Sequence, residues 1–290
     1  MSKEIKNYGR SIRGKLMNVM NETGLSYQLL LTRYFHERLL YRLTQSKYED
    51  NCVLKGGALL YAYSGLKARP TLDVDFMADK ISNDKDKMKE TFIDICNVSC
   101  PEDGVIFDPT SVTTEDITEF KEYHGVRITL IGHLDSAVQK LSIDVGFGDV
   151  MIPYPKDLEY PILIEGTPEF NINAYSLETV IAEKFQSMIS LSTYNSRMKD
   201  FFDIYCIMKG NSFDDNSLMD AIIATFKNRK TEYMDNHPVF SEAFYTDQAR
   251  KRQWQGFLRK SHIKEAPSFE EIGDFVRKVL YPYWKRLKEI

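Results

Sequence analysis

Lys55-Gly56-Gly57-Ala58-Leu59-Leu60, followed by Arg69-Pro70-Thr71-Leu72-Asp73-Val74-Asp75-Phe76, is the most informative stretch of this 290-residue chain. The glycine pair opens an apolar run, and glycines at a helix start let backbone N–H groups approach phosphate oxygens. Asp73 and Asp75 are two positions apart on a β-type segment, so their side chains point the same way. Two adjacent carboxylates favour a bound divalent cation. The stretch therefore predicts metal-dependent chemistry on a nucleoside triphosphate.

A third acidic residue, Asp144, lies in the middle of the apolar segment Leu141–Val145. A charge on an apolar strand is costly unless it is paired or bound to a metal ion. If this strand lies beside Asp73 and Asp75, Asp144 completes a set of three oxygen ligands for two Mg²⁺ ions, with Mn²⁺ as the alternative cation. The other interpretation is an acid at a strand end that caps a turn.

A second group of charges lies on two predicted helices, with Lys184 on the first and Asp200 and Asp203 on the second. The two aspartates share a helix face at i, i+3 spacing. Lys184 is a candidate countercharge for a triphosphate, with Arg197 or Lys199 pairing with Asp203. The alternative is an ordinary set of salt bridges between helices.

The periodicity of the chain predicts a helical lead-in, an α/β section and a helical section, which is an α+β fold with a mixed sheet. A stretch with three prolines, Pro153–Pro161, interrupts the pattern. We therefore expect one domain over residues 1–165 and a helical domain over residues 166–290. The polar segment 108–120 is ambiguous. The expected helices cover 5–22, 27–45, 56–63, 84–98, 177–191, 197–208, 217–227, 241–261 and 269–287, and the expected strands cover 52–55, 71–77, 105–107, 126–131, 140–145 and 162–164.

The bulk composition excludes several classes of protein. No apolar run is long enough to span a bilayer, and residues 1–13 lack the apolar core of a signal peptide. The four cysteines and five histidines are dispersed, without the spacing of a zinc site. We therefore expect a cytoplasmic protein without a membrane partner, in which the thiols are reduced and mostly buried.

The net charge of −4 does not indicate nucleic-acid binding, but the charge is uneven. From Thr225 onward, basic residues outnumber acidic ones and are interleaved with aromatic residues such as Tyr245 and Trp254. This pattern fits a surface that holds a polyanion. It fits equally a solvated face of helices over an aromatic core.

The segments together resemble the AbiEii-type nucleotidyltransferase toxins, members of the DNA polymerase β-like nucleotidyltransferase superfamily. The resemblance covers about residues 50–210 and rests on five motifs in order. These are Leu54–Leu59, Arg69–Phe76, Ile143–Asp149, Glu183–Phe185 and Arg197–Tyr205. The resemblance implies a polymerase β-like mixed-sheet domain and an enzyme of the nucleotidyltransferase type.

The resemblance also implies roles for individual residues. Asp73, Asp75 and Asp144 would be metal ligands, and Lys184 the triphosphate contact, with Asp203 a further essential acid. The nucleotide-binding residues would be Lys55, Gly56, Gly57 and Arg69, together with Lys184. The family's loop is often Gly-Ser, so Gly57 lacks the side-chain hydroxyl found there.

The implied activity is Mg²⁺-dependent transfer of a nucleotidyl group from a nucleoside triphosphate to an acceptor hydroxyl, with RNA such as a tRNA 3′ end as the first expectation. The implied role is the toxin of a bacterial toxin–antitoxin and phage-defence system, neutralised by a cognate antitoxin. Two alternatives stay open. One is transfer to a small molecule or a protein, and the other is a catalytically silent protein that only binds a partner.

Overall fold

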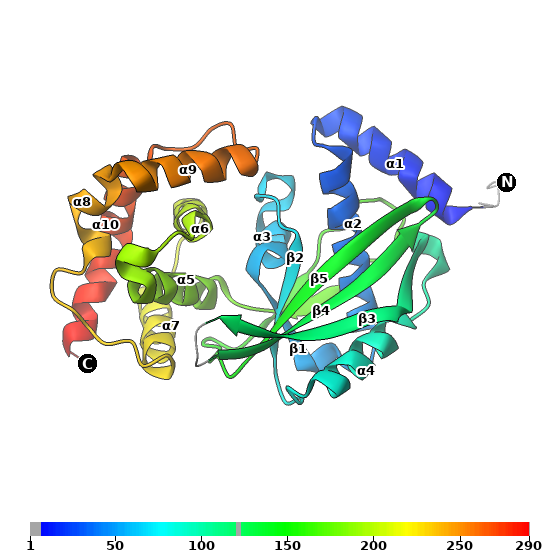
Figure 1. Cartoon of the computed structure of the whole chain (residues 1–290), viewed down its shortest axis with the longest axis horizontal. Coiled ribbons are helices and arrows are strands. Elements are labelled where there is room, and N and C mark those ends of the chain that lie inside the picture. Colours follow the sequence, from blue (N-terminus) through cyan, green and yellow to red (C-terminus); the bar gives the residue numbers. More distant parts are fainter. Residues whose placement is uncertain (1–6, 120–122, 290) are drawn as a thin grey trace. The chain divides into compact units, whose positions relative to one another are not determined.

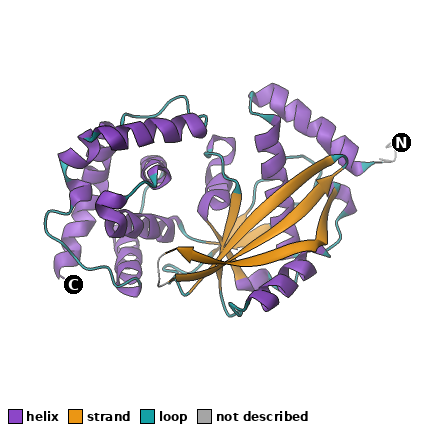
Figure 2. Ribbon diagram, in the orientation of Figure 1, coloured by secondary structure: helices purple, strands orange, loops and turns teal. Residues whose placement is uncertain are grey.

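A mixed sheet with the strand order β3-β4-β5-β2-β1-β7-β6 forms the centre of the first part of the chain (Figures 1 and 2). The computed structural model describes residues 7–119 and 123–289. The predicted α+β class is confirmed. The strands are β1 Cys52–Lys55, β2 Asp73–Ala78, β3 Val105–Glu119, β4 Tyr123–Leu134, β5 Ala137–Phe147, β6 Lys156–Glu159 and β7 Asn171–Ala174.

The helices lie before, between and after the strands. Several begin at a polar residue whose side chain accepts a backbone hydrogen bond, such as Ser26 before α2 and Ser268 before α10. Gly24 ends α1 in the left-handed conformation, as expected from the sequence. The helices are α1 Tyr8–Thr23, α2 Tyr27–Thr44, α3 Gly56–Ser64, α4 Lys85–Cys96, α5 Leu177–Leu191, α6 Met198–Gly210, α7 Asp215–Asn228, α8 Glu242–Thr246, α9 Gln248–Lys260 and α10 Phe269–Arg286.

The chain divides into two compact units. The first consists of Met1–Gly148 and Lys156–Ala174, and the second of Asp149–Pro155 and Tyr175–Ile290. This division lies later than the expected boundary at residue 165, because β7 pairs in parallel with β1 and so belongs to the sheet. The segment 149–155 joins the helical unit, where the Thr179 hydroxyl donates to the backbone oxygen of Ile152 at 2.8 Å.

Several elements differ from the sequence-based expectations. Of the ambiguous segment 108–120, residues 108–119 continue β3 as an edge strand, and residue 120 lies outside the described residues. The polar residues of this strand are tolerated because an edge strand has one side open to solvent. Residues 162–164 form no strand; instead the Leu163 N–H donates to Glu37 Oε2 at 2.6 Å. The expected helix 241–261 is interrupted at Asp247, whose side chain caps α9. The short strands β6 and β7 were not predicted.

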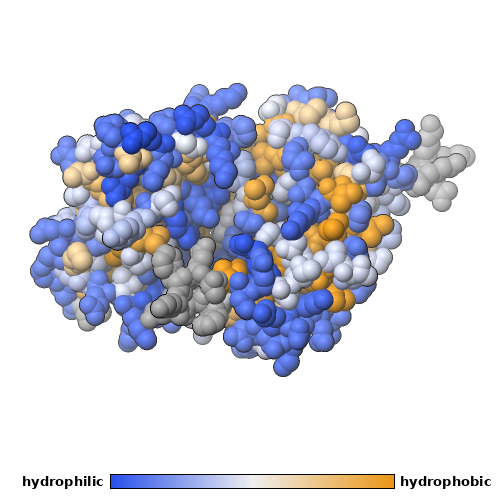
Figure 3. Space-filling model, viewed as in Figure 1, coloured by the Kyte–Doolittle hydropathy of each residue, from blue (hydrophilic) through white to orange (hydrophobic). Residues whose placement is uncertain are grey.

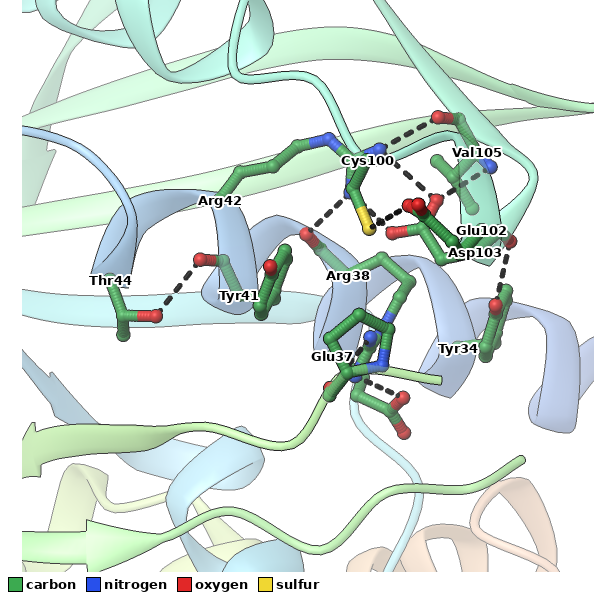
Figure 4. Close-up of polar contacts among 11 residues, drawn as sticks. Tyr34, Glu37, Arg38, Tyr41, Arg42, Thr44, Cys100, Glu102, Asp103 and Val105 are labelled. Atoms are coloured by element: carbon green, nitrogen blue, oxygen red, sulfur yellow. Dashed lines mark hydrogen bonds and ion pairs between the residues drawn. The ribbon is translucent and has the colours of Figure 1, made fainter. Parts of the chain in front are cut away.

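Helix α2 is held in the first unit by buried ion pairs (Figure 4). Arg42 donates two hydrogen bonds to the carboxylate of Asp103, at 2.7 and 3.1 Å, and a third to the backbone oxygen of Val105 at 2.7 Å. Both side chains of this pair are almost fully buried. Breaking such a pair by removing one partner typically costs about 3–5 kcal/mol. The pair therefore fixes α2 against the start of β3.

The same helix contacts the loop that leads into β2. Arg33 Nη2 donates to the backbone oxygen of Ala68 at 2.6 Å, and its guanidinium lies over the Tyr61 ring. His36 is buried, and this burial lowers its pKa to about 4, so it is neutral near pH 7. His36 is thus a packed core residue. The loop before Asp73 is therefore fixed by its hydrogen bond to Arg33, a buried residue of α2.

Two other properties follow from the elements themselves. Among the residues that the structure describes, no helix is both long and apolar enough to cross a membrane. Cys52, Cys96 and Cys100 are buried free thiols, and Cys206 is exposed. The expectation that most of the thiols are buried is confirmed.

Candidate active site

Strand β2 presents its two aspartates on one face and Val74 and Phe76 on the other. Val74 and Phe76 are fully buried, whereas Asp73 and Asp75 are half-buried. This is the alternation that a strand imposes on successive side chains. The prediction that Asp73 and Asp75 share a face is confirmed.

The sheet register brings residues from distant segments into one row. Asp75 lies opposite Lys55 of β1 on one side and Asp144 of β5 on the other. The row continues through Arg127 of β4 to Glu115 of β3. Adjacent strands are about 4.8 Å apart, so neighbouring charges in this row are within reach of one another. The expectation that the strand of Asp144 lies beside Asp73 and Asp75 is therefore confirmed.

The glycine pair lies directly against Asp75 at the start of α3. Gly56 has a φ of +68°, and a Cβ atom added there would lie 1.9 Å from Asp75 Oδ2. Gly57 packs against Thr71, whose Oγ1 would lie 2.6 Å from an added Cβ atom. A hydroxyl therefore does stand beside the turn, supplied by Thr71 rather than by a residue at position 57. That hydroxyl donates to the backbone oxygen of Asp73 at 3.2 Å, a contact that the sequence analysis did not predict.

Lys55 and Arg69 also lie in this region of the first unit. The Lys55 Nζ atom is 3.9 Å from the position that a Cβ atom at Gly146 would occupy, so the side chain extends from β1 towards β5. Arg69 is half-buried, and its Nη1 donates to the backbone oxygen of Pro70 at 3.3 Å. Their assignment as nucleotide-binding residues stays a prediction.

Arg127 is a residue of this site that the sequence analysis did not identify. Its Nε and Nη2 atoms donate to Asp144 Oδ1 and Oδ2, both at 2.7 Å. These hydrogen bonds to Asp144 raise the pKa of Arg127, and the charges of Asp73 and Glu115 raise it further. The strand register likewise places Arg127 in one row with Glu115, Asp144 and Asp75.

The available donor atoms meet the requirements of a divalent cation in part. Asp73 and Asp75 supply carboxylate oxygens, which suit Mg²⁺, an ion usually held by one or two carboxylates together with substrate phosphates and water. Within residues 7–119 and 123–289, no three His, Cys, Asp or Glu side chains are arranged as a metal cluster. Asp144 is engaged by Arg127 instead. The residues thus fit a two-carboxylate cation site, and the role of Asp144 as a third ligand stays a prediction.

The second unit contains a buried ion cluster on α5 and α6. Lys184 Nζ donates to Asp200 Oδ1 at 2.9 Å and to Asp203 Oδ2 at 2.7 Å. Arg197 Nε donates to Asp200 Oδ2 at 2.7 Å. Lys184 is only 12% exposed and both aspartates are almost fully buried. This is the geometry of the salt-bridge alternative, and a triphosphate contact by Lys184 stays a prediction.

The pKa of Asp200 gives this cluster a pH dependence. Burial by itself would raise that pKa, but the attraction of Lys184 and Arg197 outweighs burial and lowers it to about 2. A depressed carboxyl pKa contributes stability that is present above the unfolded value of 3.8 and lost as the pH falls towards 2. We expect the stability advantage of the wild type over Asp200→Asn to shrink by roughly 2 kcal/mol between pH 5 and pH 2.5.

Urea unfolding followed by tryptophan fluorescence measures this change. Trp254 and Trp284 are both buried in the second unit, and they are the only tryptophans of the chain. Asparagine does not titrate, so the difference between the two proteins isolates Asp200. A difference that stays constant across this pH range would contradict the assignment.

The basic, aromatic C-terminal region separates into core and surface. Trp254 and Tyr245 are buried, so they build the core of the helical unit. Arg229 is also engaged internally, with Nε and Nη2 donating to Asp149 at 3.0 and 2.9 Å. Arg252 and Arg259 of α9 are exposed. Figure 3 shows hydrophilic side chains over much of the second unit's helices on the viewed face. The basic charge of α9 thus lies on the surface, whereas these aromatic rings lie in the core.

Gly56 provides a direct test of the turn beside Asp75. Gly56→Ala adds a Cβ atom where Asp75 Oδ2 stands and imposes a left-handed φ on alanine. Since a displacement of about 1 Å at a reacting centre can cost 100-fold in rate, we expect a loss of roughly that size. Steady-state kinetics of nucleotidyl transfer measures it.

Gly65→Ala is the matched control for Gly56→Ala. Gly65 ends the same helix with a φ of +55°, and an added Cβ atom there meets nothing within 4 Å. This variant carries the backbone strain without the clash, so it should keep nearly full activity. Equal losses in the two variants would mean that helix strain, rather than contact with Asp75, is responsible.

Comparison with known proteins identifies the family. A model described as "Nucleotidyl transferase AbiEii toxin, Type IV TA system" matches residues 38–275, which is most of the chain. The chain belongs to the AbiEii family. It is therefore a nucleotidyltransferase of a type IV toxin–antitoxin system, and this membership implies an antitoxin as partner and a nucleotide as substrate. A search of curated proteins gives no significant match.

One solved structure supports the fold of this AbiEii-family chain, and a second is given beside it for comparison. A protein of H. pylori described as a "putative nucleotidyltransferase" is 17% identical, with a TM-score of 0.50, over 91% of this chain and 98% of its own. JHP933 from Helicobacter pylori is 17% identical, with a TM-score of 0.49, over 91% of this chain and 95% of its own. The first likeness supports the predicted polymerase β-like fold.

Proposed function

We propose that this AbiEii-family protein transfers a nucleotidyl group from a nucleoside triphosphate to a hydroxyl group of RNA, with a tRNA 3′ end as the first acceptor to test. The observation that carries the proposal is the position of Asp75. It shares a strand face with Asp73, lies opposite Asp144 in the sheet and abuts the glycine turn at Gly56. Asp75 thus belongs to the carboxylate pair and also contacts the glycine turn that we propose to bind phosphate.

The chain's own residues divide the work of the reaction. The backbone N–H groups at the start of α3 would bind phosphate oxygens, and Gly56 and Gly57 keep the approach open. Asp73 and Asp75 would hold Mg²⁺, or Mn²⁺ in its place. When bound, the cation neutralises phosphate charge and activates the attacking hydroxyl.

The reaction itself is an in-line displacement. The acceptor hydroxyl loses its proton and forms a bond to the α-phosphorus, and the bond to the β-phosphate breaks as pyrophosphate leaves. Catalysis of this step rests mainly on positioning and on charge stabilisation. Lys184 and Asp203 are proposed to take part as the family resemblance implies, although both belong to the buried ion cluster of the second unit.

The exposed basic residues of α9 support RNA as the acceptor. Arg252, Arg259 and Lys260 are exposed, whereas Arg250 and Lys251 of the same helix pair with Asp247 and Glu270. Binding of RNA phosphates by exposed basic residues releases counterions, so the apparent affinity falls steeply with salt. Transfer to a small neutral acceptor would not depend on salt in this way, because no such counterions are released. The predicted cytoplasmic location is part of the same proposal, because RNA and triphosphate are available there.

The deciding experiment is incubation of the purified protein with total bacterial RNA, Mg²⁺ and each of the four α-labelled nucleoside triphosphates. Asp75→Ala serves as the inactive control. Label in a tRNA-sized band with wild type, absent from the control, would establish donor and acceptor class together. No label on RNA with any donor would overturn the RNA proposal and favour a protein or small-molecule acceptor.

A further inference from the structure

A row of charged residues crosses the sheet, and in it Arg127 lies between Asp144 and the edge strand β3. From β3 to β1 the row reads Glu115, Arg127, Asp144, Asp75 and Lys55. Arg127 is the cationic neighbour of Asp144 on β4. Asp75 is its acidic neighbour on β2. Asp144 therefore has two possible partners on the same face: the guanidinium of Arg127, or a cation held beside Asp75.

In this structure the guanidinium of Arg127 is hydrogen-bonded to the carboxylate of Asp144. The contact is bidentate, with each carboxylate oxygen accepting one hydrogen bond at 2.7 Å. Such a planar fork is the strongest arrangement for an Arg–carboxylate pair. The pair is accessible, since the side chains of Arg127 and Asp144 are 38% and 22% exposed. The carboxylate of an accessible pair can exchange its partner for a cation from solvent. In a buried pair the same exchange would require the surrounding core to rearrange.

A divalent cation and the guanidinium compete for this carboxylate. A cation bound by Asp73, Asp75 and Asp144 would lie close to the positive charge of Arg127 and would need oxygens that the fork already holds. The strand register places Asp144 beside Asp75, so the carboxylate that Arg127 holds is the one next to the proposed cation site.

We propose that Arg127 is a positioning residue that acts as a latch on Asp144: it orients the third carboxylate and keeps it from a divalent cation until the cation displaces the guanidinium. This inference rests on the proposed cation site at Asp73 and Asp75. It assigns to Arg127 control over how tightly that site binds metal. Arg127 acts through Asp144 and does not touch the reacting atoms.

The test is a calorimetric titration of the purified protein with Mn²⁺ alone, which measures the Mn²⁺ dissociation constant. Arg127→Gln removes the fork and its competing positive charge, so we expect Mn²⁺ to bind roughly tenfold more tightly than to wild type, a change of about 1.4 kcal/mol in binding free energy. Arg127→Lys keeps the charge but loses the fork and should lie between the two. A gain in metal affinity is not a result that misfolding produces.

Two controls separate the latch from general electrostatics. Lys140→Gln removes a positive charge from β5 at an exposed position that has the same strand parity as Asp144, and it should leave Mn²⁺ affinity unchanged. In an Asp144→Asn background, Arg127→Gln should have less than about threefold effect, because the two residues act as one unit.

The outcomes distinguish this inference from the proposed function. If Arg127→Gln binds Mn²⁺ no more tightly than wild type, or not at all, the latch is overturned. The proposed cation site is tested separately by Asp75→Asn. Mn²⁺ binding that survives this substitution at full strength would place the cation elsewhere, and would overturn both the site and the latch.

Discussion

Asp75→Asn is expected to reduce nucleotidyl transfer by roughly 1000-fold or more, the largest effect of any single substitution in this chain. Asparagine keeps the shape of the side chain but removes the negative charge with which Asp75 would hold a divalent cation. Asp75 occupies the centre of the site, with Asp144 opposite it in β5 and Gly56 against its Oδ2 atom. The rate of label transfer to RNA in the presence of excess Mg²⁺ measures the loss.

The control for Asp75→Asn is Asp116→Asn in the same sheet. Asp116 lies on β3 and forms an exposed ion pair with Lys85 at 2.6 Å. Removing it also deletes one carboxylate from the sheet, and an exposed pair contributes about 1 kcal/mol or less. Activity should therefore stay near the wild-type value. Substantial turnover by a folded Asp75→Asn protein would remove Asp75 from the catalytic set.

Lys184→Met is expected to lower the free energy of unfolding of the helical unit by about 3–5 kcal/mol. The substitution keeps the length of the side chain but leaves Asp200 and Asp203 buried without the ammonium that bonds to both. Urea unfolding followed by tryptophan fluorescence measures the change, since both tryptophans lie in this unit. Lys209→Met, an exposed position of α6, should change stability by less than about 0.5 kcal/mol.

The same variant bears on whether Lys184 also binds the triphosphate. In Lys184→Met/Asp203→Asn the unpaired charge of Asp203 is removed, so part of the lost stability should return. A purely structural role predicts that triphosphate binding returns with stability, whereas a direct contact predicts that binding stays lost. A wild-type-like unfolding curve for Lys184→Met would show that the buried cluster is not a stabilising feature.

The sequence predicted the central part of the site because the signals there are local. The alternation in β2 put Asp73 and Asp75 on one face, and the glycine pair marked the start of α3. The apolar run around Asp144 indicated a strand, but whether that strand paired with β2 depended on long-range contacts. The structure provided that pairing. The family model then established the family that the motifs resembled.

Arg127 escaped the sequence analysis although a signal was present. Leu134 lies opposite Ala137 across the two-residue turn Asp135-Ser136, where Asp135 has a φ of +53°. Such a turn is typical of a hairpin, and counting back from it places Arg127 opposite Asp144. The expected strands stopped short of this turn, so they left the register between β4 and β5 open. Strands β6 and β7 were missed because each has four residues of which at most two are apolar, whereas the equally short β1 is apolar at three of its four positions.

The segment 149–155 has a consequence for how the chain can be divided. Because this segment belongs to the helical unit while residues 156–174 return to the sheet, the backbone passes from one unit to the other three times. No single cut yields two complete halves: an N-terminal fragment ending at Gly148 lacks β6 and β7, and the remaining fragment carries these strands without β1 to pair with. Any fragment that contains the whole helical unit therefore also contains β6 and β7 of the sheet.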